Sequence, residues 1–115
     1  MIIMTRLAPG IIEIAVINAA TDADVRDAFQ NLRQEAGDGH VSVLANVIER
    51  TNRAPTIELF YRHIAGALAD KIDRVAIVGE SNDEEVNTIS EALRSEVKVF
   101  REKPGAIAWL RESGH

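Results

Sequence analysis

Apolar residues along this chain follow two spacings, one typical of strands and one typical of helices. Five short apolar runs have the length and β-branched character of strands, at 2–6, 11–17, 41–48, 74–79 and 97–100. After the second run, apolar residues between the runs recur every three or four positions, as on one face of a helix. Isoleucine and valine together number 23 against 7 leucines, which favours buried strands over an all-helical bundle.

The first two runs are joined by a tight turn. Pro9 presets the φ angle of one central turn position, and Gly10 accepts the positive φ that a type II turn needs at the next. We therefore expect the chain to open with an antiparallel hairpin.

Helix signals follow the hairpin. Thr21 precedes Asp24 by three residues in a variant of the capping box, and the stripe behind it ends at Gly37. Proline fits the first turn of a helix, where its missing N–H costs nothing. We expect four helices: over 21–37, from Pro55 to near Asp70, from just after Gly79, and from Pro104.

These elements predict an α/β fold and a single domain over residues 1–115, with the order ββαβαβαβα. Strand–helix–strand crossovers are right-handed almost without exception, so the last four strands should form a mostly parallel sheet. The first strand should be antiparallel at its start. We expect the helices to pack mainly on one face of this five-stranded sheet.

Strand centres and helix stripes must face one another in such a fold. The predicted core is Ile14, Val43, Ala45, Phe60, Ile64, Leu68, Ile77, Ile89, Val99 and Leu110. The other sheet face then needs a cover, because a monomer rarely exposes a large continuous apolar surface. That cover is the first helix, a partner protein, an apolar ligand or a second copy of the chain, and we expect a weak homodimer.

Composition and charge narrow the possible partners. The 13 Lys and Arg against 18 Asp and Glu give a net charge of -5, and the basic residues are not segregated, so nucleic-acid binding is not expected. The absence of cysteine excludes disulfides and thiolate catalysis. No stretch approaches the roughly 18 apolar residues of a membrane span. We expect a cytoplasmic protein with no integral membrane segment.

Groups for catalysis or metal binding are few. His40, His63 and His115 share no metal-ligand spacing, and no nucleophile elbow, phosphate loop or dinucleotide glycine pattern is present. The acidic residues 83–85 point in different directions on a helix, where they complement its positive dipole end. The sequence therefore predicts no catalytic residue, no metal and no cofactor, and we do not expect an enzyme.

The start of the second helix is the strongest candidate site. Free N–H groups and the helix dipole favour an anion there, and two arginines stand just before it. The expected contacts of a phosphate, carboxylate or larger ligand are Arg50, Thr51, Asn52, Arg53 and Thr56. In the alternative interpretation, Asn52 or Thr56 caps the helix while both arginines are solvated.

The central strand 73–79, the acid-rich helix after it, the strand 97–100 and the closing segment 106–110 together resemble the bacterial SpoIIAA-like group of STAS and Sec-fourteen-type proteins. The resemblance implies a small α/β domain with helices against a mixed sheet. It also implies a link to partner-switching regulation or to binding of lipids and other apolar ligands. The Asp-Ser signature of phosphorylated STAS antagonists is absent from residues 49–56, so a phosphoswitch of that kind is not expected.

Two functions fit these observations. The first is a non-catalytic protein-interaction or ligand-binding module of SpoIIAA-like type with a regulatory role, binding a partner protein, its own copy, or a small apolar or anionic ligand. The alternative is a protein that binds a lipid or an apolar small molecule at the membrane surface. A basic or aromatic rim would favour the alternative, whereas this chain is acidic and has only five aromatic residues.

Overall fold

The computed structural model describes residues 1–18, 21–37, 39–48, 71–79, 83–93 and 95–112. Its elements in chain order are β1 (Ile2–Ala8), β2 (Ile11–Val16), α1 (Asp22–Ala36), β3 (Val41–Asn46), β4 (Ile72–Val78), α3 (Asp83–Leu93), β5 (Glu96–Phe100) and α4 (Lys103–Glu112). None of the described helices is long and apolar enough to cross a membrane.

The five strands form one sheet in the order β1-β2-β3-β4-β5. β1 is antiparallel to β2, and every other neighbouring pair is parallel. At the turn between the first two strands, Gly10 has a φ of 78°, the left-handed conformation that glycine adopts without steric cost. The expected hairpin and the mostly parallel five-stranded sheet are both confirmed.

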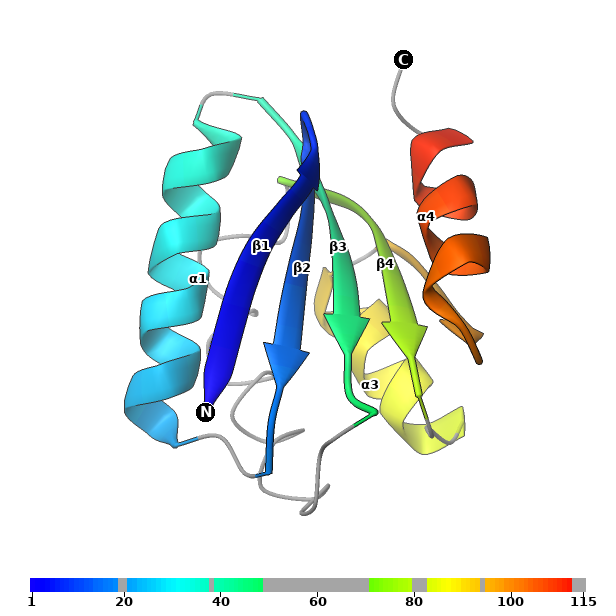
Figure 1. Ribbon diagram of the computed structural model, residues 1–115, viewed down its shortest axis with the longest axis horizontal. Helices are drawn as coiled ribbons and strands as arrows, with labels where there is room; N and C mark the ends of the chain where they lie inside the picture. Colours follow the sequence, from blue (N-terminus) through cyan, green and yellow to red (C-terminus); the bar gives the residue numbers. More distant parts are fainter. Residues whose placement is uncertain (19–20, 38, 49–70, 80–82, 94, 113–115) are drawn as a thin grey trace.

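Alternation along the strands divides their side chains between two faces of the sheet. On β2, Ile12, Ile14 and Val16 face one side, whereas Ile11 faces the other. α1 and α3 pack on the first face, and α4 packs on the second (Figure 1). Most of the described helices therefore share one face, as expected, and the second face has a helix of its own.

The second face is only partly covered by that helix. α4 lies over β3, β4 and β5. On β1, Ile3 alternates with Ile2 and Met4 and so belongs to the α4 side, where it is 45% exposed. The surface that a second copy would have to cover is thus near the β1 edge of the sheet, and the homodimer stays a prediction.

Most of the predicted core residues that the structure describes lie where the sequence placed them. Ile14, Val43 and Ile77 are buried in the cluster under α1 and α3, and Ala45 is half-buried against it. Leu110 is buried on the other face of the sheet. Val99 is 38% exposed, so its assignment to the core was wrong. β5 is an edge strand with a neighbour on one side only, and this leaves Val99 open to solvent. Phe60, Ile64, Leu68 and the side chain of Ile89 lie outside the described part of the chain.

The predicted capping box opens α1. The backbone N–H of Asp24 donates to the Thr21 hydroxyl, and the backbone N–H of Thr21 donates to the Asp24 carboxylate, both at 3.1 Å. The hydrogen bond from the Thr21 backbone holds the pKa of Asp24 below its usual value, with help from the Thr21 hydroxyl and from the N-terminal ammonium 3.6 Å away. A carboxylate with this hydrogen bond stabilises the start of the helix only while it is ionised.

This capping box makes the stability of the fold depend on pH in acid. Because the folded pKa of Asp24 is depressed, its contribution is present above the unfolded pKa and is lost as pH falls through the folded pKa. We expect Asp24→Asn to lower the free energy of unfolding at pH 7 and to have a much smaller effect near pH 2. Urea unfolding at the two pH values measures this. Asp27→Asn, one turn further along the helix, is the control, and an equal pH dependence for both variants would contradict the prediction.

Ile77 and Val99 form a matched pair, because they are register partners on adjacent strands and face the same side. Ile77→Ala should lower the free energy of unfolding by about 2–5 kcal/mol, because its side chain is 2% exposed. Val99→Ala should lower it by less than about 1 kcal/mol. Urea titration of both variants tests this, and equal losses of unfolding free energy would contradict the placement of β5 at the edge of the sheet.

Candidate functional site

A groove opens on the α4 face of the sheet, at the amino ends of β2, β3 and β4. Its volume is about 780 Å³, within the roughly 300–1,000 Å³ typical of small-molecule sites. It is lined by Ala8, Pro9, Gly10, Ile11, His40, Ser42, Asp73, Arg74, Leu110 and Arg111. The lining comes from the hairpin turn, from the starts of two further strands and from the last turn of α4.

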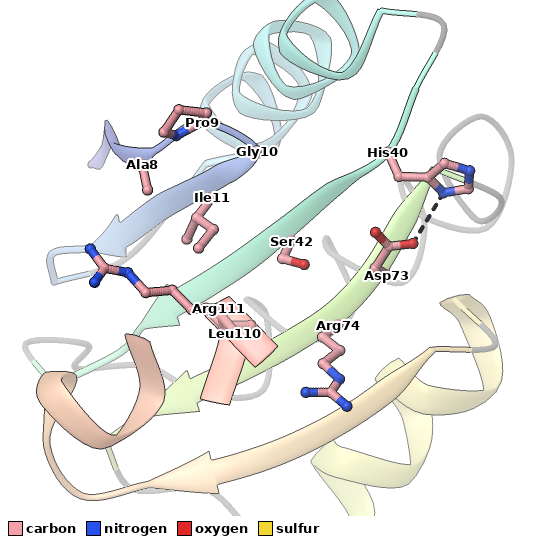
Figure 2. A pocket seen from close by; sticks show the side chains of 10 residues that line it. All are labelled: Ala8, Pro9, Gly10, Ile11, His40, Ser42, Asp73, Arg74, Leu110 and Arg111. Carbon is pink, nitrogen blue, oxygen red and sulfur yellow. Dashed lines mark ion pairs between the residues drawn. The ribbon is translucent and has the colours of Figure 1, made fainter. Parts of the chain in front are cut away.

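The middle of the groove is formed by neighbouring strands. Ile11 on β2 is the register partner of Ser42 on β3, and both are buried. The Ser42 backbone N–H donates to the Gly10 carbonyl at 2.8 Å, which ties the start of β3 to the hairpin turn. Figure 2 shows Ile11 and Ser42 between the turn on one side and His40 and Asp73 on the other. Hydrogen-bonded strands therefore hold the base of the groove in place.

His40 and Asp73 form a pair at one end of the groove. The imidazole Nδ1 lies 3.1 Å from the Asp73 carboxylate, and both side chains are exposed. A shift of register between β3 and β4 follows Val41 and Ile72, and it inserts Asp73 beside the start of β3. In Figure 2 the second nitrogen of the imidazole points away from Ser42. This arrangement offers hydrogen bonds to a ligand, and it does not line up a base with the serine hydroxyl.

Arg74 joins β4 to the last turn of α4. Its guanidinium donates to the Trp109 carbonyl at 2.9 Å and lies 4.7 Å from the centroid of the Trp109 ring. The carboxylates of Glu96 and Glu112 lie 3.9 Å away, and the Arg74 side chain is 21% exposed. A cation at this position satisfies a carbonyl at the helix end and complements the negative end of the dipole.

The first turn of α4 is held by a second charged contact. The Lys103 ammonium lies 2.7 Å from the carboxylate of Glu13 on β2, a side chain that is almost fully buried. The Asn46 amide donates to the same carboxylate at 2.9 Å. The buried charge thus has both an ion-pair partner and a hydrogen bond, as a buried carboxylate requires. With Arg74 at the other end, α4 is fixed at both ends, and so is the wall of the groove.

Arg111 lines the groove from α4 and is exposed. In the described part of the chain it has no carboxylate within ion-pair distance, in contrast to Arg74. Its guanidinium can therefore donate two parallel hydrogen bonds to a ligand carboxylate. Among the described residues, no group of three His, Asp or Glu side chains is arranged to hold a metal ion.

The site predicted from the sequence is the start of the expected second helix. Arg50, Thr51, Asn52, Arg53 and Thr56 all lie outside the described residues, so the anion site stays a prediction. Open α/β sheets usually bind ligands at the carboxyl ends of their parallel strands. The groove lies at the amino ends of β3 and β4, the opposite end of the same strands.

The groove residues were missed because no local pattern joins them. In the sequence, His40 has no metal-ligand spacing to another histidine, and no chemical motif contains Asp73, Arg74 or Arg111. The available signal was weak: His40 and the pair 73–74 stand at or near the starts of two apolar runs that parallel pairing places side by side.

Comparisons with known proteins agree on the fold. A sequence model of the SpoIIAA-like family matches residues 11–111. An uncharacterized protein of the DUF3478 family from Shewanella loihica PV-4, whose crystal structure has a SpoIIAA-like fold, is similar with a TM-score of 0.65. The two are 18% identical over 96% of this chain and 92% of that chain, a likeness that shows the fold alone. No curated protein sequence matches this chain.

The contact between Arg74 and Trp109 predicts a measurable role in docking α4. Arg74→Ala should lower the free energy of unfolding by about 1–3 kcal/mol, because it removes a charged hydrogen bond and a cation–π contact. Trp109 is the only tryptophan, so its fluorescence in the folded protein should shift to longer wavelength. Arg101→Ala, at an exposed arginine before α4, is the control and should change neither. An unchanged spectrum and stability in Arg74→Ala would contradict this role.

Proposed function

This chain belongs to the SpoIIAA-like family, and we propose that within it the protein is a non-catalytic binding module whose ligand site is the groove beside α4. The observation that carries the proposal is the groove itself. It has a ligand-sized volume, and its polar lining residues come from three segments distant in sequence. Function in such a fold depends on the site and not on the architecture.

The rigidity of the walls supports ligand binding. Backbone hydrogen bonds hold the turn and the starts of β3 and β4, and charged contacts fix α4 at both ends. A preformed site loses little conformational entropy when a ligand binds. The lining also combines apolar surface with a few placed polar groups, which is the usual make-up of a small-molecule site.

The orientation of the polar groups supports binding without catalysis. A hydrolytic site would need a nucleophile within hydrogen-bond reach of a base. Here the second imidazole nitrogen of His40 points away from Ser42, and Arg74 is directed at Trp109 and the end of α4. These side chains are positioned to hold a ligand and to secure the helix.

Filling the groove tests the proposal. Ala8 lines it, so Ala8→Trp should occupy the space, whereas Ala108→Trp places the same side chain on an exposed position of α4 outside the lining. Two-dimensional NMR with a panel of small soluble organic fragments gives the readout. In the wild type and in Ala108→Trp, we expect amide shifts to cluster at residues 8–11, 40–42, 73–74 and 110–111. Ala8→Trp should abolish them. Fragments that bind only elsewhere, or equally to all three proteins, would refute the groove as the site.

A further inference from the structure

The side chains of the groove that can be cationic differ in whether a carboxylate lies beside them. Three side chains there can carry positive charge: His40, Arg74 and Arg111. His40 is paired with Asp73, and Arg74 is stacked on Trp109 with carboxylates nearby. Arg111 is the lining arginine for which the described residues supply no carboxylate. An arriving acid therefore meets a guanidinium that need not give up an existing ion pair.

The apolar part of the lining lies mainly in the hairpin turn. Ala8 and Pro9 present partly exposed apolar surface, and Ile11 lies beneath them. Leu110 is fully buried and packs between α4 and the sheet. A ligand whose carboxylate binds Arg111 can thus place a small apolar group in contact with the turn.

We propose that the groove binds a small organic acid, with its carboxylate on Arg111 and a compact apolar body against Ala8, Pro9 and Ile11. This inference rests on the proposed function of the groove as a ligand site. A guanidinium binds a planar carboxylate through two parallel hydrogen bonds, which gives it both affinity and orientation. The far end of the ligand lies toward the His40–Asp73 pair, which offers further hydrogen bonds.

The electrostatic surroundings explain why both parts of the ligand are needed. The chain has a net charge of -5, and the carboxyl end of α4 adds partial negative charge near the groove. A free inorganic anion therefore gains little binding free energy in the groove. An organic acid also buries its apolar part against the turn, which adds to the binding free energy. Its carboxylate is stabilised only where it contacts the Arg111 guanidinium.

Three probes with the same six-carbon chain separate the contribution of the carboxylate from that of the apolar chain. They are hexanoate, hexanol and hexylamine. Each is titrated into the isotope-labelled full chain at pH 7 and low salt, and amide shifts give the dissociation constant and the location of binding. We expect hexanoate to bind in the groove about five-fold more tightly than hexanol, the gain that one partly exposed ion pair supplies. Hexylamine should bind no more tightly than hexanol. The preference for hexanoate should shrink as salt is added.

Two arginine variants locate the effect. Arg111→Gln should reduce the preference for hexanoate over hexanol to less than two-fold and leave hexanol binding unchanged. Arg101→Gln, at an exposed arginine outside the lining, should keep the full preference. Because both substitutions are at exposed positions, the folded spectrum is expected to persist.

The other outcomes are distinguishable. If hexanol or hexylamine binds in the groove as tightly as hexanoate, or if the preference survives Arg111→Gln, the acid specificity is overturned while the groove remains a ligand site. If all three probes and the fragment panel leave the groove amides unmoved, the proposed function fails as well.

Discussion

The sheet must be covered on both faces, and the rest of the structure follows from how that is achieved. Leu44, Ala76 and Val78 on the central strands are buried on the side away from α1. Parallel strands flanked by crossover helices are usually apolar on both faces for this reason. Among the described helices, α4 alone packs on this second face, so its attachment determines whether the apolar surface is hidden.

Charged contacts provide that attachment at the two ends of α4. The buried carboxylate of Glu13 costs solvation energy, which Lys103 and Asn46 offset only because their geometry is close. Arg74 binds the other end through Trp109. Apolar packing alone allows a short helix to slide or rotate on a sheet, whereas directional contacts at both ends fix its position. The groove lies between the last turn of α4, the hairpin turn and the starts of three strands.

The likeness to the Shewanella loihica protein shows that such a fold persists while most residues differ. At 18% identity over nearly the whole of both chains, what is common is the order and packing of elements. The groove proposed as the binding site includes exposed side chains, on which the packing of the fold sets few requirements. Binding chemistry must therefore be argued from this chain's own Arg111, His40 and Asp73.

The sequence by itself determined the elements that depend on neighbours along the chain. The hairpin at Pro9 and Gly10, the cap at Thr21 and the buried central strands were predicted because turn chemistry and apolar spacing are local properties. Val99 was misplaced because its run looks as apolar as a central strand, and only the strand order shows that it lies at an edge. The groove could be identified only from the tertiary structure. His40 and Asp73 are 33 positions apart and meet through parallel pairing and a register shift, and Arg111 joins them only because Arg74 and Glu13 hold α4 in place. Such contacts depend on the packing of distant segments, which no pattern along the chain records.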